Sequence, residues 1–175
     1  EMMLPPDEVE ALILYQIGAL SAIAKAEGAE LVHVKPHGAI YNQAAKARSL
    51  ADAIARAVKR FSGDLILVGL AGSGLIEAGF EVGLRVANEG FPDRNYNPDG
   101  TLVSRKEAHA IIESPEEVAK HAVELIQNGI LFGERRVFVD TLCLHGDNKH
   151  AAENAILLRK VLTKSGIEIV GLKYF

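Results

Sequence analysis

Apolar side chains recur every three or four positions between residues 7 and 27, which is the spacing of one face of an α-helix, and Gly28 follows as a helix-ending glycine. A later segment of the same kind opens with Ser114 and Pro115 before two glutamates, a strong signal for a helix start. The pattern predicts helices at residues 7–27, 49–61, 115–127 and 148–166, with a short helix inside residues 72–83.

Short apolar runs between these helical segments indicate β-strands. The run at residues 65–70 is apolar throughout, as in a strand that is buried on both faces. Strands are predicted at residues 31–34, 65–70, 84–87, 137–144 and 167–172. Regular alternation of helix and strand predicts an α/β fold with a parallel sheet covered by helices, open or barrel-like. The length of 175 residues favours a single domain, residues 1–175.

Composition and charge exclude several classes of partner. Apolar residues make up 49% of the chain, the net charge is −4, and no run of five Lys or Arg residues occurs, so neither nucleic acid nor an anionic membrane is expected as a partner. No uninterrupted apolar stretch reaches the roughly 18 residues of a membrane span. Cys143 has no second cysteine to pair with, which favours the cytoplasm. The chain begins at Glu1 rather than Met, so residues are expected to precede it.

Polar side chains gather after three of the predicted strands. The carboxyl ends of parallel strands meet at one edge of a sheet, so these side chains are expected to line one pocket. The three groups are Lys35, His37, Tyr41 and Asn42; Asp93, Arg94, Tyr96 and Arg105; and His145, Gly146 and Asp147.

Lys35 and His37 stand directly after the first predicted strand. A lysine there can orient an anion and a histidine can move a proton, whereas a turn that is only structural requires neither. The alternative is that His37 only hydrogen bonds a nearby backbone group. With two further polar strand ends expected nearby, we favour the functional interpretation.

Asp147 has two interpretations that the sequence leaves open. It can orient His145 as a base or metal ligand, or it can cap a helix that starts near Lys149. A metal is the weaker option, because no His-Glu-x-x-His or paired-cysteine spacing is present.

Two loops are ambiguous as well. The loop at residues 91–105 is either a solvated connection or a binding loop, and its length favours the second. The segment Gly-Leu-Ala-Gly-Ser-Gly at residues 69–74 suggests a phosphate cradle. It lacks both a third glycine at the dinucleotide spacing and a Walker Gly-Lys-Ser/Thr, so a tight structural turn is favoured.

Five segments together resemble the LamB/YcsF family, nearly from end to end. They are LYQIGAL with HVKPHGAIYNQAA, LILVGLAGSGLI, FPDRNYNPDGTLVSR and CLHGD, in this order. Two local departures are Pro92, where the family has a small residue, and His109-Ala110, where it has Gly-Ala. The family also begins with motifs that this chain does not contain, so the resemblance implies an incomplete barrel.

The resemblance implies part of a distorted (β/α)7 TIM-like barrel, related to glycoside hydrolases and carbohydrate deacetylases, and hence a link to carbohydrate metabolism. It implies a hydrolase that opens 5-oxoproline to glutamate with ATP as co-substrate, Mg²⁺ accompanying the ATP, and 5-oxoprolinase subunits B and C as partners. Rival interpretations are a metal-dependent amide hydrolase or deacetylase that uses His145 and Asp147, and a noncatalytic scaffold. Self-association stays open.

Within the implied reaction, the three groups of polar residues take two kinds of role. His37 or His145 is expected to act as general base, oriented by Asp147 or Asp93. No side-chain metal ligands are assigned. The residues expected to bind substrate or phosphate are Lys35, Tyr41, Asn42, Arg94, Tyr96 and Arg105.

Overall fold

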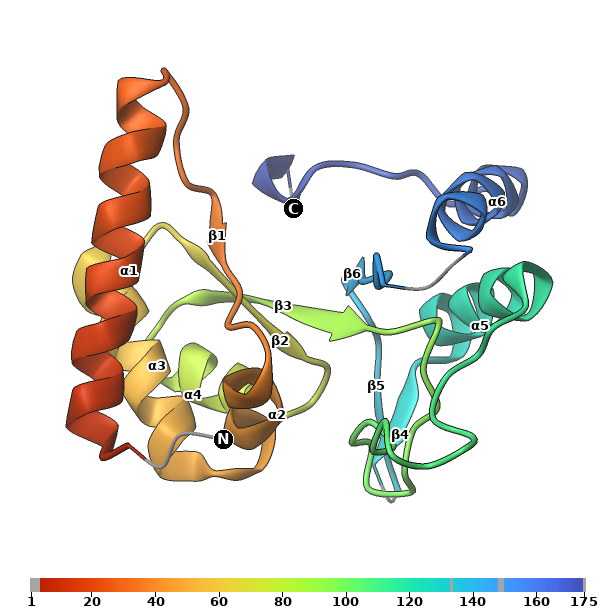
Figure 1. Ribbon diagram of the computed structural model, residues 1–175, viewed down its shortest axis with the longest axis horizontal. Coiled ribbons are helices and arrows are strands. Elements are labelled where there is room, and N and C mark those ends of the chain that lie inside the picture. The colour runs from red at the N-terminus through yellow and green to blue at the C-terminus, as the bar shows by residue number, and fades with distance from the viewer. Residues whose placement is uncertain (1–3, 133, 148–149, 175) are drawn as a thin grey trace. The chain divides into compact units, whose positions relative to one another are not determined.

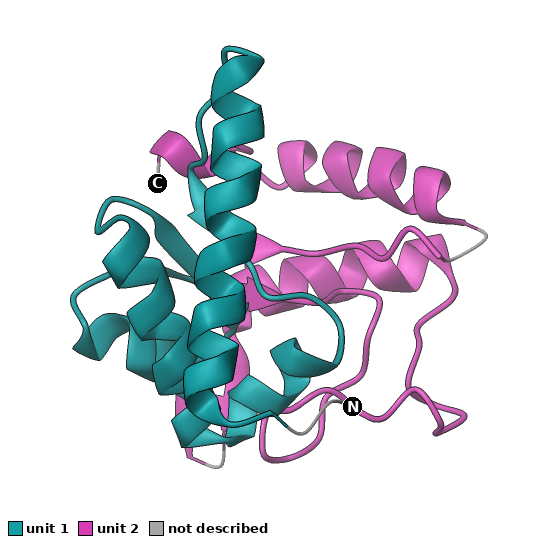
Figure 2. Ribbon diagram, turned by 60° about the vertical axis from the view of Figure 1, so that its left-hand side comes forward, with its two compact units in different colours: residues 1–87 teal, residues 88–175 magenta. Residues whose placement is uncertain are grey.

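A computed structural model describes residues 4–132, 134–147 and 150–174. The chain divides into two compact units, residues 1–87 (unit 1) and residues 88–175 (unit 2), which are coloured separately in Figure 2. The prediction of a single domain stays a prediction.

Unit 1 alternates helices and strands in the predicted order (Figure 1). One helix was missed, because its polar residues were interpreted as a loop after the first strand, although the alanine-rich segment around them has high helix propensity. This helix is α2. The elements are α1 (Pro6–Ala26), β1 (His33–Val34), α2 (Ala39–Lys46), α3 (Arg48–Phe61), β2 (Ile66–Leu70), α4 (Gly74–Glu81) and the start of β3 (Arg85–Gly90).

The strands of unit 1 are hydrogen bonded in the order β1-β2-β3. β1 pairs with β2 in parallel, with His33 opposite Ile66 and Val34 opposite Leu67. Every residue of β2 is buried, as its continuous apolar sequence predicts. The α/β class with a parallel sheet is therefore confirmed, while the (β/α)7 barrel stays a prediction.

Small residues let the helices of unit 1 approach one another and the sheet closely. Four alanines of α3 are fully buried, and α3 shares one apolar cluster with α1 and β2. Gly79 of α4 shows how tight the packing is, because a Cβ at this position would lie 2.8 Å from Val86 Cγ1 and 2.9 Å from Leu67 Cδ2. The core therefore depends on side-chain volume as well as on apolar character.

One face of α1 is fixed to α3. Val9 and Ile17 are buried in the apolar cluster. Its other face exposes apolar side chains, including Leu20 and Ile23. By length and composition alone α1 is apolar enough to cross a membrane, with a mean hydropathy of 1.4 over its most apolar window. Such a helix is weak evidence, and the absence of a membrane partner stays a prediction.

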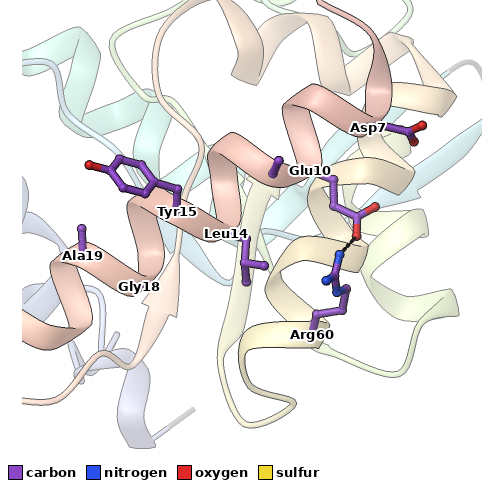
Figure 3. Close-up of a pocket in the computed structure, with 8 residues that line it drawn as sticks. Asp7, Glu10, Leu14, Tyr15, Gly18, Ala19 and Arg60 are labelled. Carbon is purple, nitrogen blue, oxygen red and sulfur yellow. Dashed lines mark hydrogen bonds and ion pairs between the residues drawn. The ribbon is translucent and has the colours of Figure 1, made fainter.

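Glu10 of α1 bridges two arginines of α3 (Figure 3). Its carboxylate accepts hydrogen bonds from Arg60 at 2.5 Å and from Arg56 at 2.8 Å. These two guanidinium groups, Arg60 before Arg56, hold the pKa of Glu10 below its usual value. A lowered pKa in the folded state stabilises the fold above the unfolded pKa, and this contribution disappears as the pH falls through the folded pKa.

Replacing Glu10 with glutamine should therefore lower the free energy of unfolding by about 1 kcal/mol near neutral pH, since both arginines are largely exposed. The difference from wild type should vanish below about pH 3, where Glu10 is protonated. Urea unfolding at several pH values measures it, and Glu8→Gln, at an exposed position of the same helix, is the control. A difference that persists in acid would contradict the ion-pair origin.

Unit 2 contains the end of β3, which pairs in parallel with β6; Glu89 lies opposite Thr141 and Gly90 opposite Leu142. The predicted helix start is confirmed, because Ser114 Oγ accepts a hydrogen bond from the Glu117 amide. The elements after β3 are α5 (Pro115–Asn128), β4 (Ile130–Phe132), β5 (Arg135–Val137), β6 (Thr141–Leu142), α6 (Ala151–Lys164) and a 3₁₀ turn (Leu172–Tyr174).

The strand predicted at residues 137–144 is divided in two. Val137 ends β5, which forms an antiparallel hairpin with β4, and the chain then turns before β6. Asp140 lies in this turn, where its carboxylate accepts hydrogen bonds from the Asn88 amide and from Asn88 Nδ2. A side chain that binds a neighbouring strand in this way replaces the regular ladder at that point.

The strand predicted at residues 167–172 is wrong. Ile167 packs against the small core between α5 and α6, but Ile169 and Val170 are 49% and 56% exposed. No strand of the described part of the chain pairs with this segment. Its β-branched residues therefore have no sheet to join. The first two residues of the helix predicted at 148–166 lie outside the described residues.

Candidate functional site

Asp93 and His145 form a hydrogen-bonded pair in unit 2. They follow β3 and β6, two adjacent parallel strands, so both emerge at the same edge of the sheet. Asp93 is 2% exposed, and its Oδ2 lies 2.8 Å from His145 Nδ1 and 3.1 Å from the His145 amide nitrogen. Asp93 thus fixes both the backbone and the ring of His145.

The hydrogen-bond partner determines which ring nitrogen of His145 carries the proton. An ionised carboxylate oxygen only accepts hydrogen bonds, so Nδ1 is the donor and Nε2 of the neutral ring keeps its lone pair. Phe91 stacks on the imidazole, with ring centroids 5.5 Å apart and planes inclined by 22°. The side chain of His145 is 24% exposed. A fixed, partly accessible imidazole with Nε2 unprotonated can act as a general base.

The second carboxylate oxygen of Asp93 is also buried. Oδ1 has no hydrogen-bond partner among the described residues. The described donors to this carboxylate, both on Oδ2, therefore come from His145. A buried carboxylate with few donors interacts strongly with a positive charge on its neighbour, because little else offsets its own charge.

Arg94 and Tyr96 stabilise the loop that carries Asp93. Arg94 is 6% exposed and donates to the carbonyl oxygens of Val103 at 2.5 Å and Ala110 at 3.2 Å; burial lowers the pKa of its guanidinium group. The Tyr96 hydroxyl oxygen accepts from the Phe91 amide at 2.7 Å, and burial raises the pKa of this phenol. Both residues were predicted to bind substrate or phosphate. That role stays a prediction, although both side chains bind backbone groups.

Arg105 and Asp147 form an exposed ion pair at 2.6 Å, with 43% and 64% of their side chains accessible. The Arg105 guanidinium holds the pKa of Asp147 below its usual range. Asp147 does not cap α6, whose first residue is Ala151 and whose N-cap position has no side-chain hydrogen bond. The helix-cap interpretation is therefore wrong, and it is Asp93 that contacts the His145 ring.

The first polar group lies in unit 1. Lys35 Nζ is 5.6 Å from the centre of the buried Tyr41 ring, a cation–π distance. Tyr41 and Asn42 belong to α2, while Lys35 and His37 line a cavity of about 1120 Å³ between α1 and the segment that leads into α2. The prediction that this group shares a pocket with the residues of unit 2 stays a prediction.

The glycine-rich loop at residues 69–74 has the features of a tight structural turn. Gly72 has a φ of +70°, which favours glycine. A Cβ at Gly69 would meet Leu75 at 3.1 Å, and one at Gly74 would meet the Ala45 carbonyl oxygen at 3.4 Å. The end of α2 therefore lies against the start of α4, where a phosphate cradle would need space.

His121 contributes to the site although no sequence pattern selected it. It lies on α5, and its Nδ1 is 2.9 Å from the Pro92 carbonyl oxygen. In the sequence His121 is only a histidine within an amphipathic helix, and no local signal connects it to a residue 29 positions earlier. No group of three or more His, Cys, Asp or Glu side chains suited to a metal occurs among the described residues.

Comparison with known proteins identifies relatives of the whole chain. The sequence profile of the LamB/YcsF family matches residues 1–175. The A subunit of 5-oxoprolinase from Methylococcus capsulatus is 50% identical over 98% of this chain and 67% of its own length, and that from Pyrococcus horikoshii is 48% identical over 99% and 70%.

Among solved structures, the lactam utilization protein from Thermus thermophilus matches with a TM-score of 0.85 and 44% identity, over 97% of this chain and 69% of that chain. This chain thus spans about two thirds of the length of these relatives. Both the fold and the sequence, including the segments that carry Asp93 and His145, are shared at this level of identity. The chain belongs to the LamB/YcsF family.

Proposed function

We propose that this chain is the A subunit of an ATP-dependent 5-oxoprolinase, which cleaves 5-oxo-L-proline to L-glutamate with hydrolysis of ATP. Curated relatives at 47–50% identity over nearly the whole chain are named as the A subunit of 5-oxoprolinase, which implies a hydrolase with several subunits. The observation within the chain that carries the proposal is the buried Asp93 carboxylate holding Nδ1–H of His145. This dyad supplies the general base that hydrolysis of a lactam requires.

An unstrained five-membered lactam is a poor electrophile, and ATP can correct this. Transfer of the γ-phosphoryl group to the lactam oxygen releases ADP and makes the ring carbon electrophilic. His145 Nε2 then takes a proton from water as the water oxygen bonds to that carbon, and Asp93 stabilises the imidazolium that forms. The imidazolium returns the proton to the ring nitrogen as the carbon–nitrogen bond breaks. A second water releases the phosphate and leaves glutamate.

Arg105 is the best candidate for binding an anion of the ligand. It is accessible and already pairs with a carboxylate, that of Asp147, so a substrate carboxylate or phosphate can exchange with this partner. Arg94, in contrast, directs its donors to two backbone carbonyl groups. Lys35, His37, Tyr41 and Asn42 remain proposed ligand-binding residues. Mg²⁺ is proposed to accompany ATP.

Three further features belong to the proposal. The partners are 5-oxoprolinase subunits B and C, in keeping with the relatives' designation by the letter of one subunit among several. The chain forms part of a distorted (β/α)7 barrel, related to carbohydrate-active deacetylases, and self-association remains open. Its location is the cytoplasm, in keeping with its single, unpaired cysteine.

The deacetylase alternative is less well supported. It uses His145 and Asp147 as metal ligands, but each of these side chains already has a partner of another kind. His145 Nδ1 binds Asp93, and Asp147 pairs with Arg105. Among the described residues no third ligand of the required type joins them.

The proposal predicts that the chain, combined with subunits B and C, releases glutamate and phosphate in equal amounts from 5-oxoproline and ATP. Glutamate and phosphate are measured in parallel, and the controls omit either ATP or one of the three proteins. Turnover without ATP would favour a simple amide hydrolase. Turnover that is unchanged in a His145→Gln variant would favour a scaffold and contradict the proposal.

A further inference from the structure

His121 of α5 is a histidine that the proposed mechanism does not use. Its Nδ1 lies 2.9 Å from the Pro92 carbonyl oxygen. Because a carbonyl oxygen only accepts hydrogen bonds, Nδ1 of His121 carries a proton and donates it. The ring also meets Tyr96 edge-on, with centroids 6.1 Å apart and planes at 73°. His121 is therefore bonded to the residue directly before Asp93.

The short segment before Asp93 is held at successive positions. The Phe91 amide donates to the Tyr96 hydroxyl oxygen, and the Phe91 ring stacks on His145. His121 adds the only one of these contacts that comes from α5 in the described structure. A peptide plane fixed by its carbonyl oxygen cannot rotate freely. The direction of the Asp93 side chain therefore depends on this hydrogen bond.

We infer that His121 is a positioning residue for the Asp93–His145 dyad, and that its Nδ1–H fixes the Pro92 carbonyl group and with it the Asp93 carboxylate. His121 touches neither the substrate nor the reacting atoms. The expected effect on catalysis rests on the proposed function, whereas the alignment of the dyad is a property of the chain itself. Because the base is misaligned while ligand contacts remain, loss of the bond acts on kcat rather than on KM.

Two substitutions separate the donor of His121 from its ring. His121→Phe keeps an aromatic ring against Tyr96 but has no donor, whereas His121→Asn keeps an amide donor near the position of Nδ1. Lys120→Ala, at an exposed neighbouring position of α5, is the control. We expect His121→Phe to lower kcat about tenfold with KM within about twofold. His121→Asn should stay within about threefold of wild type in kcat, and Lys120→Ala should equal wild type.

A second measurement does not depend on catalysis. Histidine labelled with ¹⁵N in the full chain reports the His145 Nδ1–H proton, which is protected from exchange with water while Asp93 accepts it. This resonance should be present in wild type, His121→Asn and Lys120→Ala, and lost in His121→Phe. If His121→Phe does not fold, the resonance in His121→Asn decides the matter.

An unchanged resonance in folded His121→Phe, or its loss in folded His121→Asn, would overturn the inference whatever the turnover. Wild-type kcat in His121→Phe would overturn it as well. Failure of the proposed function has a different signature, because wild type then gives no 5-oxoproline-dependent turnover while the resonances still follow the expected pattern. In that case the positioning role of His121 stands and the reaction must be sought elsewhere.

Discussion

Replacing Asp93 with alanine is expected to lower kcat for 5-oxoproline cleavage about 10³- to 10⁴-fold, and asparagine only about 10²-fold. Alanine removes the acceptor, so the His145 ring loses both its orientation and its Nδ1–H tautomer. Asparagine can keep its carbonyl oxygen at the position of Oδ2, where both donors of His145 lie. It loses only the negative charge that stabilises the imidazolium.

The buried Oδ1 of Asp93 explains why asparagine should be the milder change. No described donor contacts Oδ1, so nothing forces the asparagine oxygen to that side. Its NH₂ group would take this place as a buried donor, which costs about 1–3 kcal/mol of stability but preserves the tautomer.

Steady-state kinetics with subunits B and C, after circular dichroism has verified the fold, measures the effect of both changes. Asp99→Asn in the same loop is the control, since Asp99 binds the backbone and hydroxyl of Thr101. If Asp93→Ala retained more than about a tenth of the wild-type kcat, the dyad would not be catalytic, because loss of a general base has a larger effect. Equal losses in the two variants would show that the charge, rather than the acceptor, matters most.

The sequence predicted the main part of the site because strand ends are readable. A buried apolar strand followed by polar residues marks a position at the sheet edge, and this reasoning selected both Asp93 and His145. It left open whether Asp93 or Asp147 orients the histidine. The answer depends on the register of β3 and β6, in which Glu89 lies opposite Thr141. Register between strands about fifty positions apart is not encoded locally.

The direction of a side chain was less accessible to sequence reasoning than its position. Arg94 and Arg105 are the same residue type in one loop, yet Arg94 is buried on two carbonyl groups while Arg105 reaches an exposed carboxylate. The loop backbone needs donors for its carbonyl groups, and only the folded path shows which arginine supplies them. His121 was missed for the same reason, since its partner Pro92 comes from another element.

Errors in the fold have a similar origin. The hairpin of β4 and β5 was missed because three-residue strands carry too little periodicity to be recognised. The last predicted strand, at residues 167–172, has β-branched residues but no partner strand in the described chain. Local propensity predicts a strand only where a neighbour is available to complete its hydrogen bonds.

The hairpin imposes a strict requirement on Gly129, the residue that ends α5. Gly129 has φ +67° and ψ −175°, a region that only glycine occupies readily. A Cβ there would lie 2.5 Å from the Val137 carbonyl oxygen, because β5 pairs with β4 so that Val137 lies opposite Ile130. Gly129→Ala therefore combines backbone strain with a clash against backbone, which unlike a flexible side chain cannot move away cheaply.

We expect Gly129→Ala to lower the free energy of unfolding by about 3 kcal/mol, of which the strain accounts for about 1–2 kcal/mol and the clash for the rest. Gly166→Ala is the matched control. Gly166 also follows a helix of unit 2, α6, and has φ +74°, but a Cβ there would meet nothing within 4 Å. It should lose only about 1 kcal/mol, the penalty of the left-handed conformation.

Urea unfolding followed by circular dichroism gives both values, and hydrogen exchange of the α5 amides shows where the loss occurs. The α5 amides should exchange faster in Gly129→Ala than in Gly166→Ala, because the clash lies at the end of that helix. Equal destabilisation by the two substitutions would mean that the hairpin yields and that Val137 is not held over Gly129. A larger loss in Gly129→Ala shows instead that the hairpin fixes the end of the helix that carries His121.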